Sequence, residues 1–223
     1  MDLLLLIVPL IICIVAQINV QRTYTKFHKV RNARGLTGAE VARQILDNNG
    51  LNYVRVEMVH GQLTDHFDPR SNVVCLSESV YNETSVAALG VAAHECGHAV
   101  QHAENYGPIV VRSNLVPIAN FCSRAWYLIF IIGLALSSSL LGRGMVTFGI
   151  ILFLGVALFQ LVTLPVEFNA SSRALAILET QGFLEGREID GAKEVLKAAA
   201  LTYVAALLHS LLQLLRLIRI ARD

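Results

Sequence analysis

Charged residues are scarce in this chain, and their signs nearly cancel. They make up 16% of the 223 residues, with a formal net charge of +1. No run of like charges forms a basic arm, so we exclude nucleic acid as a partner. Hydrophobic residues account for 54% of the chain, and the mean hydropathy is +0.54. This composition is far from that of an ordinary soluble enzyme, and it predicts a protein surrounded by a lipid bilayer.

Cysteines are also few, and they lack the paired spacing of a disulfide framework. The four are Cys13, Cys75, Cys96 and Cys122, and Cys13 lies inside an apolar segment. We therefore expect small buried side chains or free thiols.

Long apolar runs are abundant and divide the chain. They cover residues 3–20, 125–141, 145–164 and, less cleanly, 198–218. Runs of this length can cross a bilayer as helices. The charges follow the first run and do not precede it, which argues against a cleaved signal peptide. Gly142, Arg143 and Gly144 separate the second and third runs, so residues 125–164 are predicted to form a tight transmembrane hairpin.

The fourth run differs from the others because polar side chains recur on it at helical spacing. They are Thr202, His209, Gln213 and Arg216. Such a stripe can pack against other helices, line a water-filled cavity, or mark a helix lying in the membrane interface. We favour four spans, with residues 198–223 forming an apolar helix and a basic tail.

Residues 21–124 form the one sizeable polar region. Thr37 and Glu40 have the spacing of a capping box, for a helix that ends near Asn49. Residues 51–59 then alternate apolar and polar side chains, as a strand does. Residues 71–77 are predicted to form a second short strand, after a turn rich in Gly, Asp and Pro.

The next helix contains the most informative motif, HECGH at residues 94–98. Asn82 or Thr84 is expected to cap this helix, which must end by Gly107. Histidines four residues apart project from the same helical face, so both imidazoles can reach one metal ion. A glutamate follows the first histidine. This is the pattern of zinc peptidases, in which His94 and His98 are ligands and Glu95 is the general base.

A catalytic zinc site usually has a third protein ligand. One peptidase class takes it six residues after the second histidine, beyond a glycine, but these positions hold Glu104 and Gln101. His102 lies on the same helix, where three ligands could hardly surround one ion. Glu167 is the better candidate, because two complete membrane crossings return the chain to the side of the motif. Pro165 is expected to end or kink the incoming span, with Glu167 near the start of a new helix.

Together these features resemble the integral-membrane gluzincin peptidases, which include the prenyl-protein protease and heat-shock membrane protease families. A more specific resemblance, to the YugP-type neutral zinc metallopeptidases, covers nearly the whole chain. The segments that carry it are DHFDPRSNVVCLSESVYN, GVAAHECGHAVQHA, LPVEFNASSRAL and KAAALTYVAALL.

This resemblance implies a mainly α membrane protein, with transmembrane helices and a zincin-like catalytic region that contains a small β-sheet. It implies one Zn²⁺ per chain, held by His94, His98 and Glu167, with Glu95 as the base. The substrate would be a protein or peptide. Gluzincins often place an aspartate four residues after the ligand glutamate, where this chain has Ser171. Ser171, Asp65 or Asp68 would then have to orient a ligand histidine.

Two further sets of site residues are weaker predictions. In zinc peptidases of this layout an edge strand pairs with the extended substrate, and the strand containing Val73, Val74, Cys75 and Leu76 directly precedes the site helix. The developing oxyanion needs a donor, and Arg173, Tyr203 and His209 lie downstream of Glu167. Arg173 could equally pair with a local carboxylate, and His209 could bond within the helix bundle.

The loop that contains His60, Asp65, His66 and Asp68 has no compact ligand spacing. We expect a structural or substrate-rim role for it, with turn chemistry explaining Asp68 before Pro69.

The sequence predicts five segments: helix 1–20, catalytic region 21–124, hairpin 125–164, third-ligand helix and connector 165–197, and apolar helix with basic tail 198–223. Five basic residues follow the first span, from Arg22 to Arg34. The positive-inside rule therefore predicts a cell (inner) membrane protein with its catalytic region in the cytoplasm.

Two other functions stay open. One is a catalytically inactive membrane adaptor. The other is a site-2-type intramembrane protease, which the residues Ile189 to Gly191 faintly resemble. Further membrane-protein partners, or a homo-oligomer, are compatible with the sequence.

Overall fold

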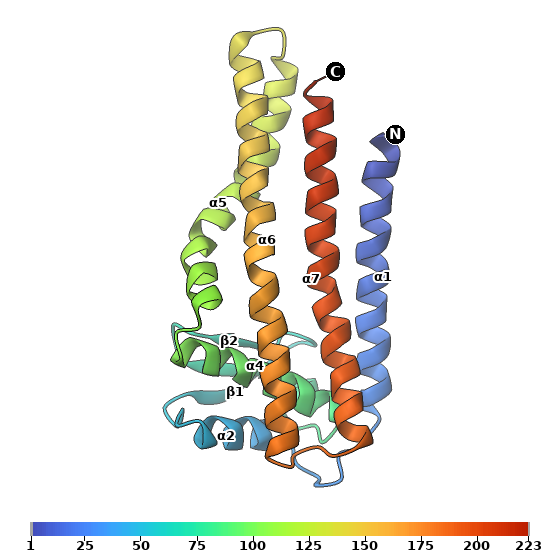
Figure 1. Cartoon of the computed structure of the whole chain (residues 1–223), viewed down its shortest axis with the longest axis vertical. Helices are drawn as coiled ribbons and strands as arrows, with labels where there is room; N and C mark the ends of the chain where they lie inside the picture. Colours follow the sequence, from blue (N-terminus) through green and yellow to red (C-terminus); the bar gives the residue numbers. More distant parts are fainter. Residues whose placement is uncertain (1, 223) are drawn as a thin grey trace. The chain divides into compact units, whose positions relative to one another are not determined.

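The computed structural model describes residues 2–222, which are mainly helical (Figure 1). The elements are α1 (Asp2–His28), α2 (Gly38–Asn48), β1 (Arg55–Val59), β2 (His66–Asp68), β3 (Val73–Ser77), α3 (Glu78–Tyr81), α4 (Val86–Ala103), α5 (Gly107–Ala135), α6 (Leu140–Thr180) and α7 (Arg187–Ile220). Helices α1, α5, α6 and α7 are long and apolar enough to cross a membrane. The predicted fold class, a mainly α membrane protein with a small β-sheet, is confirmed.

The chain divides into two compact units. Unit 1 comprises residues 1–17, 110–165 and 202–223, and unit 2 comprises residues 18–109 and 166–201. Each unit is therefore assembled from stretches that are far apart in the sequence.

In unit 1, α5 and α6 pack closely because glycines remove side chains from their contact. A Cβ atom on Gly149 would lie 2.9 Å from the Cβ of Phe130. Phe130 packs with Val146 and Phe153 of α6 and with Leu217 of α7. The members of the predicted polar stripe on α7 are half-buried.

The turn of the predicted hairpin lies earlier than expected, at residues 136–139. Gly142, Arg143 and Gly144 belong instead to the start of α6. The Ser139 hydroxyl accepts a hydrogen bond from the backbone N–H of Gly142 (3.0 Å), as a helix cap does. Gly142 also packs against the carbonyl of Leu136, where a side chain would not fit.

Pro165 does not end the incoming span, since α6 runs through it from Leu140 to Thr180. A proline in a helix removes one backbone hydrogen bond, which neighbouring packing can compensate in a membrane protein. Glu167 therefore lies within a continuous helix and not at the start of a new one.

Unit 2 has a three-stranded sheet with the order β1-β3-β2. β3 pairs in parallel with β1 and antiparallel with β2. β2 was not predicted, because its three residues lie in a segment with the composition of a turn.

The apolar core of unit 2 surrounds α4. Val41, Ile45 and Leu46 of α2 pack there with Leu89 and Ala92 of α4. The capping box of Thr37 and Glu40 is present at the start of α2, as predicted. Ser85, and neither Asn82 nor Thr84, caps α4. Packing on several sides holds α4 in place.

Candidate metal centre

The two histidines of the HECGH motif lie one turn apart on α4. Their ring centroids are 4.7 Å apart, and the ring planes are nearly perpendicular, at 84°. The side chains of His94 and His98 are 14% and 11% exposed. The motif therefore presents two neighbouring, largely buried imidazoles.

Glu167 of α6 completes a group of three. Its Oε2 atom lies 3.4 Å from Nε2 of His94 and 3.5 Å from Nε2 of His98. The residue is 2% exposed. Among the described residues, His94, His98 and Glu167 are the group whose ligand atoms all lie close enough to hold one metal ion.

The spacing of these atoms fits a tetrahedral zinc ion. Zinc lies about 2.0–2.2 Å from nitrogen and oxygen ligands, so ligands at two corners of a tetrahedron are about 3.3–3.5 Å apart. Both nitrogen-to-oxygen distances, 3.4 and 3.5 Å, agree with this edge length. The three side chains are thus close enough together to serve as the protein ligands of one zinc ion.

The electrostatic surroundings also favour a cation at this point. Burial lowers the pKa of His98, but hydrogen bonding to Glu167 and the charges of Glu95 and Glu167 outweigh it, so the pKa is raised above its usual value. Glu95, the predicted base, is itself buried. A divalent cation would supply the positive charge that these two carboxylates favour.

Gly97 allows the two ligand-bearing helices to approach. A Cβ atom at this position would lie 2.8 Å from the carbonyl oxygen of Ala170, which is on α6 between Glu167 and Ser171. Real Cβ atoms essentially never come so close to backbone atoms. The glycine of HECGH therefore sets the distance between α4 and α6.

Ser171 contacts one ligand directly. Its Oγ atom lies 3.2 Å from Nδ1 of His94. With Nε2 facing Glu167, Nδ1 is the nitrogen available to donate to this hydroxyl. The other two candidates have other partners, since the carboxylate of Asp65 accepts from Ser77 and that of Asp68 accepts from Arg70 and Ser71.

Gln101 contacts the other ligand, and the sequence analysis missed it. Its Oε1 lies 3.0 Å from Nδ1 of His98. Its Nε2 donates to the carbonyl of Val166 and to Oδ1 of Asn169, both at 2.9 Å. The residue is 0% exposed. Its position three residues after His98, on the same helical face, was the available signal.

Arg173 determines which atoms donate and which accept in this hydrogen-bond network. An arginine can only donate, and its Nε donates to Oδ1 of Asn169 (2.8 Å). The facing atom of Gln101 must then be its amide nitrogen, which turns the Gln101 oxygen toward His98. His98 must then carry a proton on Nδ1, which leaves Nε2, the atom that faces Glu167, as the nitrogen that can bind a metal.

The opposite end of Arg173 is held by a carboxylate. Its Nη1 lies 2.7 Å from Oε2 of Glu104. Of the two roles considered for Arg173, the structure thus shows pairing with a local carboxylate. Tyr203 and His209, the other predicted oxyanion donors, belong to unit 1, whereas the metal group belongs to unit 2.

The expectation of an edge strand at residues 73–76 is wrong. β3 is the central strand of the sheet, and Val73, Val74 and Leu76 are core residues, with Cys75 half-buried. β1 pairs along all of β3 and β2 pairs with residues 73–75, so a substrate strand cannot add beside these three residues. β2 lies at one edge of this sheet.

The remaining histidines lie apart from the metal group. His102 stacks edge-on against Phe67 of β2, with ring centroids 5.9 Å apart. His60 bonds to Glu78, and His66 bonds to the carbonyl of Thr64. The loop therefore has structural contacts, in keeping with one of the two roles predicted for it.

Comparisons with known proteins agree with this geometry. Residues 2–222 match a family described as "Putative neutral zinc metallopeptidase". The chain is 51% identical over 205 residues to a protein of Bacillus subtilis (strain 168) named "Putative membrane protease YugP", covering 92% of this chain and 89% of the relative. No solved structure matches the chain. With the family match spanning its described length, this chain belongs to the neutral zinc metallopeptidase family.

Proposed function

We propose that this protein is a membrane-embedded, zinc-dependent endopeptidase with one zinc ion per chain. His94, His98 and Glu167 would hold the ion, and Glu95 would act as general base. The observation that supports this most strongly is the pair of distances from Glu167 to the two histidines, 3.4 and 3.5 Å, which match the edge of a tetrahedral zinc site.

When bound, zinc supplies a Lewis acid that polarises the scissile carbonyl and lowers the pKa of water. Glu95 takes the proton from the attacking water and returns it to the leaving amine. Gln101 and Ser171 hold the Nδ1 protons of the two ligand histidines, so that both Nε2 atoms keep their lone pairs for the metal. The products are two peptides.

The test of this mechanism is Glu95→Gln, which keeps the shape of the side chain and removes the base. We expect zinc to be retained and peptide cleavage to fall by about 10²–10⁴-fold, the usual contribution of a general base. Zinc content and turnover of a quenched peptide are measured together. Glu83→Gln, an exposed substitution with the same charge change, is the control. Full activity of the Glu95 variant removes this residue from the mechanism.

The same variant distinguishes a peptidase from a catalytically inactive adaptor. An inactive adaptor should keep its cellular phenotype in the Glu95→Gln background, whereas a peptidase should lose it and accumulate substrates. For the site-2-type alternative, Asp190 is exposed in the first turn of α7, and it is outside the group of potential ligands among the described residues. Nothing therefore favours that reading.

We place the substrate along β2 instead of β3. β2 is an edge strand, and its Phe67 ring contacts His102, which follows the motif on α4. An extended peptide could add to this edge through main-chain hydrogen bonds. A series of substrate peptides, each with one N-methylated amide near the scissile bond, tests this. The KM should be higher for the peptides methylated at every second position than for the others. Equal cleavage of all the methylated peptides contradicts strand addition.

We further propose that the catalytic region faces the cytoplasm. Arg22, Lys26, Lys29, Arg31 and Arg34 follow the first apolar run, and positive residues are retained on that side. Labelling of a cysteine introduced at exposed Gln62 should then require permeabilised cells. Labelling in intact cells by an impermeant reagent contradicts this orientation.

A further inference from the structure

Positive charge predominates in the sequence of unit 1, whose acidic residues are Asp2 and Asp223. Residues 110–165 and 202–222 contain no Asp or Glu, but they contain arginines at 112, 124, 143, 216, 219 and 222. Charged groups next to a bilayer are costly unless they are paired or reach the polar headgroups. The excess of arginine makes an anionic ligand at this unit worth considering, beginning with Arg143 and Arg222.

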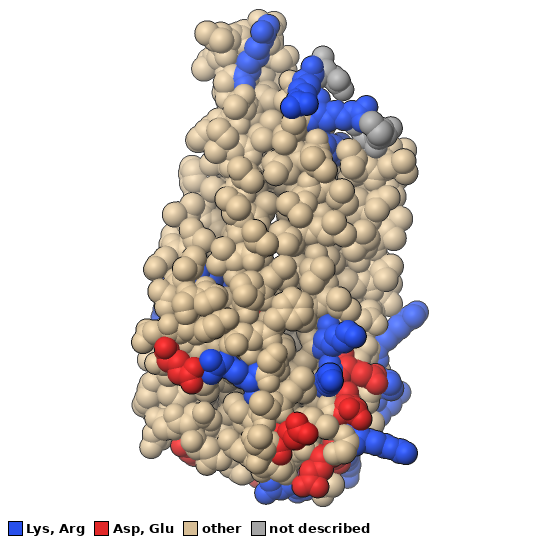
Figure 2. Space-filling view, viewed as in Figure 1, with Lys and Arg blue, Asp and Glu red and all other residues tan. Residues whose placement is uncertain are grey.

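Two of these arginines line one hollow at the end of unit 1 where α6 begins and α7 ends. The hollow has a volume of about 440 Å³ and is lined by residues of both helices and by Ser137 of the preceding turn. Arg143 comes from the first turn of α6, and Arg222 from just beyond α7. On the face shown in Figure 2, basic side chains gather at this end, and those below them along unit 1 are mostly uncharged.

The guanidinium of Arg143 is held in place but keeps most of its donors. Its Nε donates to the carbonyl of Ser137 (3.3 Å), which uses one of five N–H groups. Arg222 and Ser137 also line this hollow, and their side chains carry further donors. Paired guanidinium groups with a hydroxyl are suited to phosphate oxygens.

Apolar side chains form the rest of the site. Val146 and Ile220 line the hollow and also belong to the packed cluster around Phe130 and Leu217, so the wall is preformed. Beside it, Leu140 and Leu141 are 89% and 69% exposed. A free phosphate would make no favourable contact with this apolar surface, whereas lipid acyl chains would.

We propose that this hollow binds the phosphate of an anionic phospholipid. Arg143 and Arg222 would contact the phosphate, and the acyl chains would lie along the exposed apolar surface at the start of α6. The headgroup would balance arginines that would otherwise break the positive-inside rule at this end of the chain.

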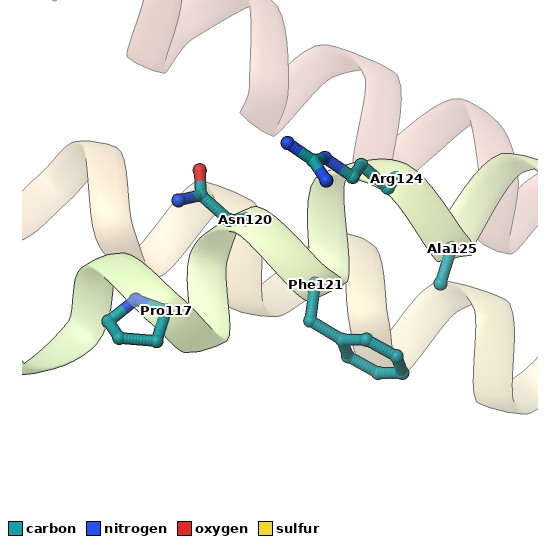
Figure 3. Close-up of a pocket in the computed structure, with 5 residues that line it drawn as sticks. All are labelled: Pro117, Asn120, Phe121, Arg124 and Ala125. Carbon is teal, nitrogen blue, oxygen red and sulfur yellow. The ribbon is translucent and has the colours of Figure 1, made fainter.

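A second hollow in unit 1 does not bring two arginines together. It is lined by residues of α5 alone, from Pro117 to Ala125. Figure 3 shows Asn120 and Arg124 on one side of the helix and Phe121 on the other. One guanidinium on one helix offers no clamp for a phosphate.

The test is native mass spectrometry of the purified full chain with phosphatidylglycerol, phosphatidylcholine or inorganic phosphate. Phosphatidylglycerol should bind most tightly. Replacing both arginines, Arg143→Gln with Arg222→Gln, should weaken its binding about 30-fold, because each arginine near a bilayer surface contributes roughly fivefold. Each single substitution should cost about fivefold.

The matched control is Arg70→Gln with Arg187→Gln, which makes the same charge change at exposed positions of unit 2. This control should leave lipid binding unchanged. Zinc content of every variant reports folding and does not depend on the lipid. The proposal is overturned if phosphatidylcholine binds equally, if inorganic phosphate displaces the lipid at equal concentration, or if the control pair weakens binding as much as the Arg143 and Arg222 pair.

Discussion

The side-chain amide of Gln101 is neutral, and its orientation is fixed by its hydrogen-bond partners. Its oxygen faces His98 because its nitrogen must face Val166 and Asn169, and Asn169 is in turn oriented by Arg173. Partners of this kind hold a ligand ring in one orientation and one tautomer, which strengthens its bond to the metal. The network thus connects Arg173 to a metal ligand that it does not touch.

Replacing Gln101 by Leu should lower zinc affinity by about 10–100-fold, the usual effect of losing such a partner. Gln101→Glu keeps an acceptor for His98 and loses the two donated bonds, so its affinity should lie between those of wild type and the Leu variant. Competition titration with a chromogenic zinc chelator measures all three. Gln62→Leu, in an exposed loop, is the control. Unaltered zinc affinity in the Leu variant would show that Gln101 has no positioning role.

Among single residues, the sequence predicted those whose role follows from their spacing in the chain. His94 and His98 share a helical face by arithmetic alone, and Glu95 is their neighbour. Ser171 was one of three candidates for orienting a ligand histidine, and Gln101 was not predicted, because spacing places residues near a ligand but does not show which atoms meet. Their contacts depend on how α4 and α6 pack.

Among the elements, the contact between α4 and α6 matters most, since it brings the ligands of the two helices together. Both Gly90 and Gly97 lie in α4, but their surroundings differ. A Cβ on Gly97 would lie 2.8 Å from the Ala170 carbonyl oxygen, while one on Gly90 would meet the Cβ of Ala192 at an ordinary 3.5 Å.

Gly97→Ala should therefore push α6 away, destabilise the fold by about 1–3 kcal/mol and weaken zinc binding. Gly90→Ala should be tolerated, and could even stabilise α4 by up to about 1 kcal/mol through helix propensity. Thermal unfolding and zinc titration of both variants provide the comparison. If the two alanine variants behave alike, the close approach at Gly97 does not control the site.

Element types were easier to predict than element limits. The capping box identified α2, alternation identified β1, and a short segment after a turn rich in Gly, Asp and Pro identified β3. The position of β3 in the sheet was misjudged, because the local sequence cannot show that β2 would pair on its other side. Pro165 suggested a break that α6 does not have, since the loss of one backbone bond is a local signal and packing outweighs it.

For the whole molecule, chain order is a poor guide to the units. Residues 110–124 were assigned to the catalytic region but belong to unit 1, while residues 166–201 join residues 18–109 in unit 2. What the sequence could predict was that the number of membrane crossings between the two ligand-bearing segments is even. Two crossings between His98 and Glu167 return the chain to the same side, and the structure places these residues in one unit.

The most direct test of the whole account is the zinc content of the purified protein. Wild type should bind one zinc ion per chain, and Glu167→Gln should bind it about 10–1,000-fold more weakly, because a charged ligand is replaced by a neutral amide. Glu83→Gln should bind as wild type does. Wild-type affinity in the Glu167 variant would contradict a metal centre shared between α4 and α6.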